Sequence, residues 1–522
     1  MPSQVAKEKR YERWPAAVCS WFFYVKQTFN QERTFPHLLN VLPITYIWNR
    51  RVKGGNEMKG KTSIVMLTYN ELHLTKTCIE SIKQHTNSGQ YELIVVDNAS
   101  TDGTKEYVRE LDDVIFIDNE ENEGFAKGCN QGAKKASGDS ILFLNNDTIV
   151  TENWLPPLKE ALFASEQIGM VGPVSNYVSG PQMVQPSYTD VKELPAFAKE
   201  YTSKRKGQRT YVHRLVGFCL LVKRKLIEDV GLFDERFVYG SFEDDDLCLR
   251  SLLKGYQLQI VHDSFVHHHG HATFNANQET NISTLFTENR LRFLDKWGID
   301  LNLITPHPYF AELLPEDAAR VLDVGCGAGA TGLELMNRQS VDMYGVEADT
   351  LKAAVSKAYY EEVFEANADE YPWSEKEAFF DAVIFSDVLE HVSDPWHIIE
   401  QAHASLKPGG VIICCLPNMM HAEVLLPLMT GDFTYQDVGI LDRTHIRFFT
   451  PNTMRALFPD QLFERVIEQR INVQIDQNVQ LFFDEVARIG VSLGFQTKAL
   501  SDQVTLYQLL IVVRKKGGSL LG

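Results

Sequence analysis

Two separate stretches of this chain have the form of an apolar strand that runs into a polar or glycine-rich loop. The first begins at Thr62, and the second occupies residues 320–332 with the sequence Arg-Val-Leu-Asp-Val-Gly-Cys-Gly-Ala-Gly-Ala-Thr-Gly. In open parallel sheets, ligands bind beyond the carboxyl ends of the strands, where such loops lie. Because the two loops differ in chemistry, the sequence predicts two α/β domains and two reactions. A chain of 522 residues suits this division.

The composition indicates a globular protein, with 44% hydrophobic and 11% aromatic residues. Its eight cysteines include no Cys-x-x-Cys pair, which favours a reduced compartment without a disulfide framework. The start of the chain has no apolar run followed by a small-residue cleavage site, and no stretch reaches the ~18 apolar residues of a membrane span. We therefore expect a cytoplasmic protein.

Charge is unevenly distributed along the chain. The net charge is -18, yet residues 1–60 hold ten Lys and Arg against four Glu, so this segment carries about +6 among many aromatic residues. Such a segment can make peripheral contact with an anionic membrane, here the inner face of the plasma membrane. The alternative is that its aromatic side chains brace the next domain. The acidic remainder argues against nucleic acid as a partner.

Four apolar runs in the first half read as strands of one sheet, at residues 62–67, 93–96, 114–117 and 140–144. Between the first two, apolar residues recur at helical spacing (Leu74, Cys78, Ile79, Ile82), so a βαβ unit is predicted. Each run ends in polar residues. These polar segments should therefore meet at the carboxyl edge of the sheet.

The polar segments resemble those of the family 2 glycosyltransferases, which are inverting enzymes of the GT-A fold. The matching segments are Thr68-Tyr69-Asn70, Val95–Gly103, Asn122–Ala126 and Leu144–Thr148. The resemblance implies a nucleotide-sugar donor, with Asp97 contacting its base and ribose. The donor-binding residues that it implies are Thr68, Tyr69, Asn70, Glu71, Asp97, Asn98, Asn145 and Asn146.

The same resemblance implies a divalent metal, Mn or Mg. Asp147 corresponds to the last acid of the family's Asp-x-Asp motif, while Asn145 stands where many members carry Asp. A hard cation would bridge this carboxylate and the pyrophosphate leaving group. In the cluster 266–271, His267 or His268 is the expected further ligand; alternation along a strand prevents all four histidines from reaching one ion. The alternatives are a four-histidine zinc site and, for the Asn-Asn-Asp triplet, a simple turn.

An acidic segment follows at residues 243–246 (Glu-Asp-Asp-Asp). By resemblance, Asp244 is the catalytic base that takes the proton from the acceptor hydroxyl. Clustered like charges raise the pKa of one member, which suits a base. The neighbouring Asp245 and Asp246 compete for this assignment, and a solvated helix start is the structural alternative.

After a predicted linker at 305–315, the second half of the chain contains a different series of motifs. A lone glycine loop at 323–329 would also fit a dinucleotide enzyme, but the segments that follow it resemble class I S-adenosylmethionine-dependent methyltransferases. The closest likeness is to the group attached to polysaccharide-synthesis proteins, through Asp387–His391, Leu416–Asn418 and Gly439–Thr450. The cofactor-binding residues implied are Asp323, Gly325, Gly327, Gly329, Glu347, Asp369 and Asp387.

Within that resemblance, Gly325 and Gly327 line the methionine part, Glu347 binds the ribose hydroxyls and Asp369 faces the adenine. His391 is either the general base for O-methyl transfer or a histidine that orients the helix start. His445 and Arg447 are candidate sugar contacts. Because methyl transfer has no anionic leaving group, a metal requirement is expected in the first domain alone.

The sequence thus predicts an N-terminal segment (1–60), a GT-A glycosyltransferase domain (61–304) and a Rossmann-like class I methyltransferase domain (305–522). The expected function is bifunctional: sugar transfer with inversion from a nucleotide-sugar to a glycan, lipid-linked or protein acceptor, and methylation of a sugar hydroxyl. The alternative is that one domain is a catalytically silent binding module in a glycan-assembly complex. The sequence leaves the oligomeric state open.

Overall fold

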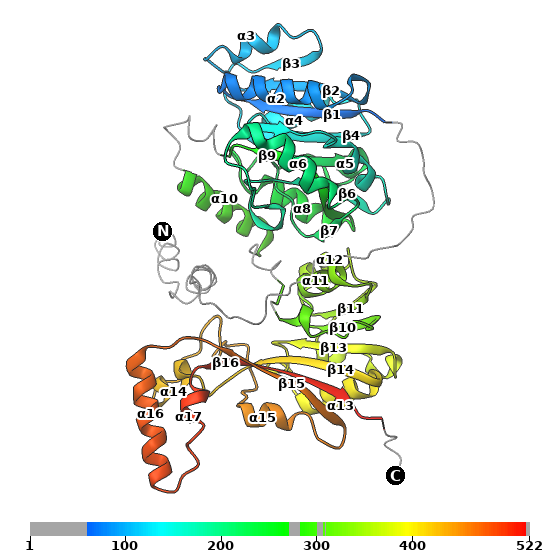
Figure 1. The fold of residues 1–522 in the computed structure, drawn as a ribbon. Coiled ribbons are helices and arrows are strands. Elements are labelled where there is room, and N and C mark those ends of the chain that lie inside the picture. The colour runs from blue at the N-terminus through cyan, green and yellow to red at the C-terminus, as the bar shows by residue number, and fades with distance from the viewer. Residues whose placement is uncertain (1–59, 271–281, 300–305, 308, 518–522) are drawn as a thin grey trace, which may run out of the picture. The chain divides into compact units, whose positions relative to one another are not determined.

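The computed structural model describes residues 60–270, 282–299, 306, 307 and 309–517. Almost all of the basic segment 1–60 lies outside these residues, so both interpretations of it stay predictions. Two sheets organise the described chain, the first from β1 to β9 and the second from β10 to β16 (Figure 1). The α/β class predicted for both domains is confirmed.

The first sheet has the strand order β3-β2-β1-β4-β8-β6-β9-β5, and β7 pairs with β9. Its first four strands are parallel, and β8 is antiparallel to both β4 and β6. The four strands predicted from the sequence are confirmed as β1 to β4. The strands are β1 (Thr62–Thr68), β2 (Tyr91–Asp97), β3 (Val114–Asp118), β4 (Ser140–Asn145), β5 (Thr148–Val150), β6 (Ile168–Val174), β7 (Arg209–Val212), β8 (Cys219–Lys223) and β9 (Gln257–His268).

Helices follow the parallel strands of this sheet. In α2 the apolar side chains at the predicted helical spacing (Leu74, Cys78, Ile79 and Ile82) are all buried. The helices of this domain are α2 (Leu72–His85), α3 (Thr104–Arg109), α4 (Phe125–Lys135), α5 (Leu155–Leu162), α6 (Leu194–Ser203), α7 (Arg224–Val230), α8 (Glu243–Leu253) and α10 (Ile282–Trp297).

Strand register decides which polar residues meet. The pairing of β1 with β2 sets Thr68 beside Asp97, and the pairing of β1 with β4 sets Leu67 beside Asn145. The predicted donor segments therefore lie along one edge. The short strand β5 pairs with the end of β9 and sets Thr148 opposite His268. This pairing brings the Asn-Asn-Asp segment to the histidine cluster.

The second sheet has the order β12-β11-β10-β13-β14-β16-β15, parallel as far as β14 and antiparallel beyond it. The chain crosses over between β10 and β13, so a switch point lies at the carboxyl end of β10. The strands are β10 (Arg320–Val324), β11 (Asp342–Glu347), β12 (Glu362–Glu365), β13 (Phe380–Ser386), β14 (Leu406–Pro417), β15 (Phe463–Asn472) and β16 (Leu506–Lys515).

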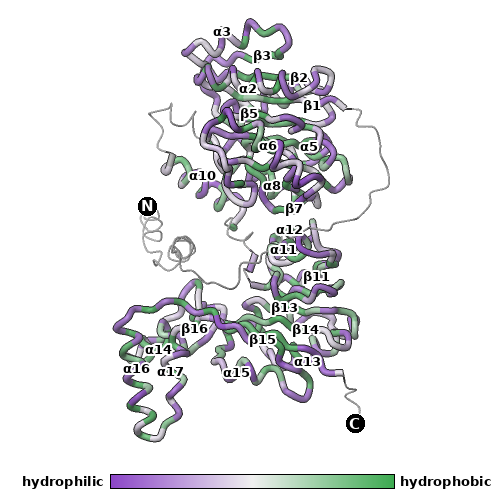
Figure 2. The backbone as a smooth tube through the Cα atoms, in the orientation of Figure 1, coloured by the Kyte–Doolittle hydropathy of each residue, from purple (hydrophilic) through white to green (hydrophobic). Residues whose placement is uncertain are grey.

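The helices of the second domain fall into two groups. Some connect the strands of the sheet, while α14, α16 and α17 gather into a small lobe beside β15 and β16 (Figure 1), held by Ala422, Phe483 and Val504. Figure 2 shows the hydrophobic runs of β13 and β14, which form the centre of the sheet. The helices are α11 (Ala330–Arg338), α12 (Thr350–Ser356), α13 (Pro395–Ser405), α14 (Ala422–Met429), α15 (Pro451–Ala456), α16 (Gln477–Ser492) and α17 (Leu500–Gln503).

The described part of the predicted linker at 305–315 packs into the protein. Phe310 is completely buried, and its ring stacks on that of His307 with the centroids 4.1 Å apart. An isolated Phe carried no signal of burial in the sequence.

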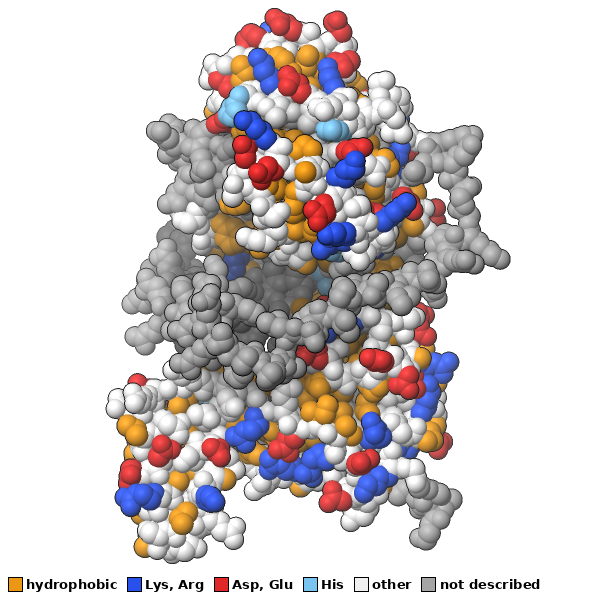
Figure 3. All heavy atoms as spheres, in the orientation of Figure 1, with side chains coloured by type: hydrophobic (Ala, Val, Ile, Leu, Met, Phe, Trp, Pro, Cys, Tyr) orange, Lys and Arg blue, Asp and Glu red, His pale blue; other side chains and the backbone are white. Residues whose placement is uncertain are grey.

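In the described part of the chain, no helix combines the length and apolarity needed to cross a bilayer. On the face drawn in Figure 3, hydrophobic side chains are interspersed with charged ones. Scattered exposed hydrophobic residues are ordinary on protein surfaces.

Candidate active sites

The donor edge of the first sheet is centred on Asp97 at the end of β2. Its Oδ1 accepts a hydrogen bond from the Ser100 amide at 2.8 Å, whereas its Oδ2 is buried without a hydrogen-bond partner among the described residues. Burial raises the pKa of Asp97, against the opposing effect of the Ser100 hydrogen bonds. A buried carboxylate oxygen without a partner is costly, so this atom is suited to a ligand donor.

Two turns frame this edge. Asn70 and Glu71 both adopt left-handed backbone conformations (φ 57° and 59°), which non-glycine residues adopt rarely. The Asn70 side chain accepts a hydrogen bond from the Thr101 amide at 2.8 Å, and the Asp102 carboxylate accepts one from the Leu72 amide at 2.9 Å. These bonds lock the loops after β1 and β2 together.

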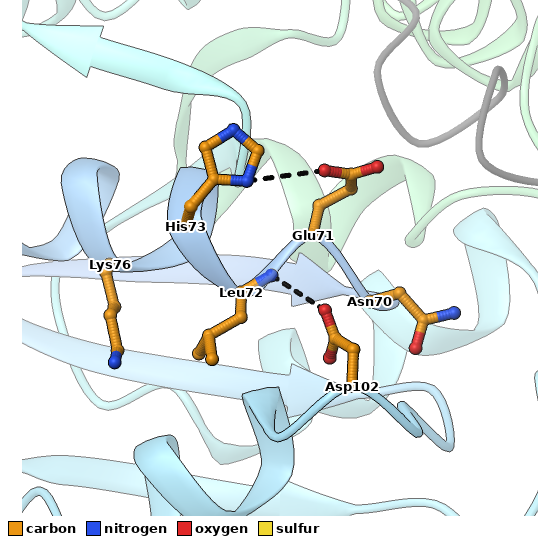
Figure 4. A pocket seen from close by; sticks show the side chains of 6 residues that line it. All are labelled: Asn70, Glu71, Leu72, His73, Lys76 and Asp102. Atoms are coloured by element: carbon orange, nitrogen blue, oxygen red, sulfur yellow. Dashed lines mark hydrogen bonds and ion pairs between the residues drawn. The ribbon is translucent and has the colours of Figure 1, made fainter.

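A pocket opens between these two loops (Figure 4). The close-up shows the dashed contacts of Glu71 with His73, at 3.5 Å, and of the Leu72 amide with Asp102. Two of the predicted donor residues, Asn70 and Glu71, thus line this pocket. The pocket is lined by Asn70, Glu71, Leu72, His73, Lys76 and Asp102.

The other predicted donor residues are mostly engaged in the protein itself. Asn98 binds Gly124 and two neighbouring asparagines, and Thr68 contacts the Thr75 hydroxyl at 3.0 Å. Asn146 donates to the same Thr75 hydroxyl at 3.1 Å. These side chains therefore position the edge, while their contact with a donor stays a prediction, as it does for Tyr69 and Asn145.

Asp147 and His268 form the candidate metal pair. His268 Nε2 lies 3.2 Å from Asp147 Oδ1, and neither atom makes a hydrogen bond with any residue that the structure describes. His268 Nδ1 donates to the Tyr177 carbonyl at 2.8 Å, which leaves the lone pair of Nε2 facing the carboxylate. Two facing acceptors fit a bound cation.

His267 does not share that arrangement. Its Nδ1 lies 2.6 Å from the Tyr188 hydroxyl, and its ring packs edge-on against His269 at 4.8 Å. Successive residues of β9 point to opposite faces, so His267 and His268 are directed to different surroundings. The geometry therefore favours His268 over His267 as the ligand, a choice that the sequence left open.

The acidic segment lies at the start of α8 and is entirely buried. Asp244 Oδ2 accepts a hydrogen bond from the Gly217 amide at 2.8 Å, and its Oδ1 accepts one from the Asp245 amide at 2.9 Å. A carboxylate held by backbone amides is fixed in orientation, as a base must be. The structural alternative was a solvated helix start; the segment does begin a helix, but its acids are buried.

The neighbours of Asp244 have different tasks. Asp246 accepts hydrogen bonds from Arg250 at 2.8 Å and from the Trp297 indole at 2.9 Å, so it anchors α10. Asp245 is paired with Arg214, a residue that the sequence did not single out. Burial and the charge of Asp244 raise the pKa of Asp245, against the pull of Arg214, to about 7. Burial and the charge of Asp244 also raise the pKa of Glu243, so the raised pKa values belong to Glu243 and Asp245.

The loop before α8 is unusually constrained. Tyr239, Ser241 and Phe242 all have positive φ, at 63°, 76° and 72°. The amide of Asn289 on α10 donates to carbonyls of this loop, including that of Gly240 at 2.8 Å. Such conformations persist where the surroundings hold them. The backbone leading to Asp244 is therefore fixed from the opposite side by α10.

In the second domain the glycine loop has the geometry that its sequence predicts. Gly325, Gly327 and Gly329 have φ of 70°, 55° and 81°. A Cβ atom on Gly325 would lie 2.4 Å from Val388 Cγ2, so no other residue fits there without displacement. Glu347 Oε2 accepts a hydrogen bond from the Gly327 amide at 2.7 Å. The loop and the predicted ribose-binding acid are thus in direct contact.

Two further predicted cofactor residues lie in contrasting places. Asp323 is buried beneath the loop and accepts a hydrogen bond from the Tyr360 hydroxyl at 2.8 Å; burial raises its pKa to about 7. Its position suits a support for the loop better than a ligand contact. Asp369 is exposed and accepts a hydrogen bond from the Ser393 hydroxyl at 3.2 Å.

Asp387 follows β13 with a left-handed backbone (φ 52°). Burial raises the pKa of Asp387, and Gln508 on β16 donates to its carboxylate at 2.7 Å. His391 lies beyond it with Nδ1 3.2 Å from the Thr444 carbonyl. The segment Asp387–His391 therefore lies at the same edge as the glycine loop, because Val388 packs against Gly325. The sequence did not single out Gln508, because no local pattern connects it to residue 387.

These two edges define a two-domain α/β protein with two separate candidate ligand sites. Residues 63–231 match the family model described as glycosyl transferase family 2, and residues 301–466 match the one described as a methyltransferase domain. The chain thus carries a family 2 glycosyltransferase domain followed by a methyltransferase domain, in the order that the motifs predicted.

Characterised relatives match one domain at a time. The chain is 28% identical over 209 residues to glycosyltransferase AglE of Haloferax volcanii, a match that covers 38% of this chain and 64% of that protein. It is 33% identical over 145 residues to the ubiquinone biosynthesis O-methyltransferase of Photorhabdus laumondii, which covers 26% of this chain and 58% of that protein. The chain thus spans less than two thirds of either relative.

Solved structures resemble the chain at the level of single domains. The structure of GalNAc-T7 with UDP, GalNAc and Mn²⁺ has a TM-score of 0.36 and 19% identity, and the match covers 46% of this chain and 49% of that one. A methyltransferase from Mesorhizobium loti has a TM-score of 0.27 and 16% identity, and the match covers 40% of this chain and 96% of that one.

Proposed function

We propose that the protein is a bifunctional enzyme that builds a methylated glycan. The first domain transfers a sugar from a nucleotide-sugar donor to a glycan, lipid-linked or protein acceptor with inversion, and the second methylates a sugar hydroxyl with S-adenosylmethionine. The observation that carries this proposal is that each domain has the acid its reaction needs at the ligand edge of its sheet. These acids are Asp147 beside His268, and Glu347 at the end of β11, which accepts a hydrogen bond from the glycine loop.

In the first domain, the loops after β1 and β2 would hold the nucleotide, with Asp97 Oδ2 as the acceptor for its hydroxyl or base donors. Asp147 and His268 would hold a divalent cation, which when bound would neutralise charge on the pyrophosphate. Asp244 takes the proton of the acceptor hydroxyl as that oxygen attacks the anomeric carbon from the face opposite the leaving group. The amides of Gly217 and Asp245 keep this carboxylate oriented.

In the second domain, the backbone of the glycine loop would approach the methionine part closely, and Glu347 would accept hydrogen bonds from the ribose hydroxyls. A hydroxyl oxygen of the acceptor sugar would then form a bond to the methyl carbon as the bond between that carbon and the sulfonium sulfur breaks, and the hydroxyl proton would pass to a base. His391 Nε2 is a candidate for that base, because Nδ1 faces the Thr444 carbonyl. Burial and the nearby His445 lower the pKa of His391, which keeps the imidazole neutral.

The two reactions are proposed to act on one product, since a covalent link raises effective concentration when both sites handle the same molecule. The test gives the purified chain a panel of nucleotide-sugars with Mn²⁺, S-adenosylmethionine and candidate acceptors, and analyses the products by mass spectrometry. We expect a glycosylated and methylated product. Glycosylation without methylation of that product would refute the shared product, and failure of either ligand to bind by calorimetry would mark that domain as a silent module.

A further inference from the structure

A second cluster of metal-ligand side chains lies in the methyltransferase domain, beyond the residues used so far. The segment after β13 places Glu390 next to His391, and the chain returns more than fifty residues later to cover it. The amides of Ile446 and Arg447 both donate to the Glu390 carbonyl, at 2.9 and 3.0 Å. This backbone contact brings His445 against the two earlier side chains.

Glu390, His391 and His445 converge closely. Each can offer one ligand atom, and these atoms all lie within 4.8 Å of one another. Glu390 Oε1 is 3.9 Å from His445 Nε2, and the two imidazole rings are 4.7 Å apart and nearly perpendicular. Glu390 and His445 are buried, whereas His391 is exposed, so the cluster has an open side.

The buried Glu390 carboxylate has no hydrogen-bond partner among the described residues. Its side chain is 1% exposed, and neither oxygen makes a hydrogen bond with any described residue. Burial and the nearby charge of Asp387 raise the pKa of Glu390 well above its usual value. Leaving such a group without a partner costs free energy, while a bound cation would satisfy both oxygens.

The two histidines are oriented as metal ligands are. His445 Nδ1 donates to the Ile440 carbonyl at 2.9 Å, and His391 Nδ1 lies 3.2 Å from the Thr444 carbonyl. A carbonyl accepts only, so in each ring the Nδ1 carries the proton and the Nε2 carries the lone pair. Metal-bound histidines commonly use the same arrangement, in which the second nitrogen donates to a backbone carbonyl.

We propose that Glu390, His391 and His445 bind a divalent transition-metal cation at the acceptor side of the methyltransferase site. One carboxylate and two imidazole nitrogens suit Zn²⁺, Co²⁺, Mn²⁺ or Fe²⁺ better than Ca²⁺. This set leaves coordination positions free on the exposed side at His391. It is separate from the Asp147 and His268 pair and departs from the expectation that the second domain needs no metal.

The role assigned to the cation rests on the proposed function. A hydroxyl of the acceptor sugar would occupy a free position, where coordination lowers its pKa. The oxygen then forms a bond to the methyl carbon as the bond from sulfur to that carbon breaks, so the sulfonium becomes a neutral thioether and the proton passes to solvent. His391 would then be a ligand rather than the base.

The test compares full-length variants by titration with Co²⁺ after removal of metals, followed by visible absorption and calorimetry. All carry Asp147→Asn to weaken the first-domain pair. We expect stoichiometric Co²⁺ binding in this background, weakened by more than the ~10–100-fold typical of losing an outer partner when Glu390→Gln or His445→Gln is added. His397→Gln, at an exposed histidine of the same domain, should leave Co²⁺ binding unchanged.

Thermal melting and S-adenosylmethionine binding of each variant distinguish metal loss from unfolding. The proposal is wrong if folded Glu390→Gln binds Co²⁺ as its parent does, because the ion would then lie on the histidines of residues 267–269. It is also wrong if the parent binds none, which would make Glu390 a protonated core residue. Metal binding without any methyl transfer would instead count against the proposed function and leave the metal site standing.

Discussion

The two ligand edges of this molecule are built by opposite means. The first uses side chains: Asp97 and Asp244 are oriented by hydrogen bonds from backbone amides, and Asp147 faces His268. The second uses backbone: three glycines with positive φ leave space for a ligand, and one acid, Glu347, braces them. Substitutions that keep side-chain shape should therefore harm the first edge most, and added volume should harm the second most.

The largest effect is expected at the catalytic base. Asp244→Asn should reduce glycosyl transfer by about 10²–10⁴-fold, because the amide cannot take the proton of the acceptor hydroxyl. Donor affinity should change little. The measurements are steady-state kinetics and calorimetry with the nucleotide and Mn²⁺, with Glu160→Gln, an exposed acid on α5, as the control. An equal loss of donor affinity would show that another carboxylate is the base.

The second edge should lose its ligand when a larger side chain fills the space at the glycine loop. Gly325→Arg should weaken S-adenosylmethionine binding by roughly 100-fold or more while glycosyl transfer continues, because even a Cβ there meets Val388 at 2.4 Å. Gly409→Ala is the matched control: this glycine also has positive φ (78°), but its Cβ would meet nothing within 4 Å. If both variants lose the cofactor equally, general destabilisation and not loop volume is the cause.

The choice between adjacent histidines sharpens the account of the first edge. His268→Ala should raise the Mn²⁺ concentration needed for glycosyl transfer by about 10–100-fold, because it removes the nitrogen facing Asp147. His267→Ala, which removes the partner of Tyr188, should change the required Mn²⁺ concentration far less. The reverse order of effects would return the ligand role to His267.

The smallest effect concerns stability. Asp323 has a pKa of about 7 in the folded protein, above its ordinary value of 3.8, so the folded state holds this proton more tightly than the unfolded state. Its contribution to the free energy of unfolding is therefore greatest at low pH and falls as pH rises from about 4 through 7, by about 1.4 kcal/mol for each pKa unit.

Asp323→Asn should remove that dependence. Between pH 5 and pH 8 the variant should lose ~1–3 kcal/mol less than the wild type does, measured by denaturant unfolding. Asp369→Asn, at an exposed acid on the same domain, supplies the comparison. Parallel pH profiles for the wild type and Asp323→Asn would mean that Asp323 is ionised in the folded state.

Local patterns predicted the local structure well. The four strands of the first parallel set and the helix at α2 were foreseeable, because each depends on residues a few positions apart. The family resemblance then carried the two domain assignments, which the family models bear out.

What the sequence could not supply were contacts between distant residues. The pairing of β5 with β9 sets His268 opposite Thr148, and Arg214 forms an ion pair with Asp245, which lies thirty-one residues further along the chain. The approach of His445 to Glu390 depends on backbone bonds between segments that are fifty residues apart. Glu390 itself stood within a recognised motif, yet only its burial without a partner distinguishes it.

The left-handed backbone at Tyr239, Ser241 and Phe242 has a consequence for protein engineering. Each such residue costs of order 1–3 kcal/mol, and glycine would adopt the same angles freely. Glycine at Ser241 is therefore a candidate thermostabilising substitution that a directed-evolution screen for heat resistance should recover. The same change would loosen the approach to Asp244, so a screen for turnover should reject it, in the usual trade between robustness and activity.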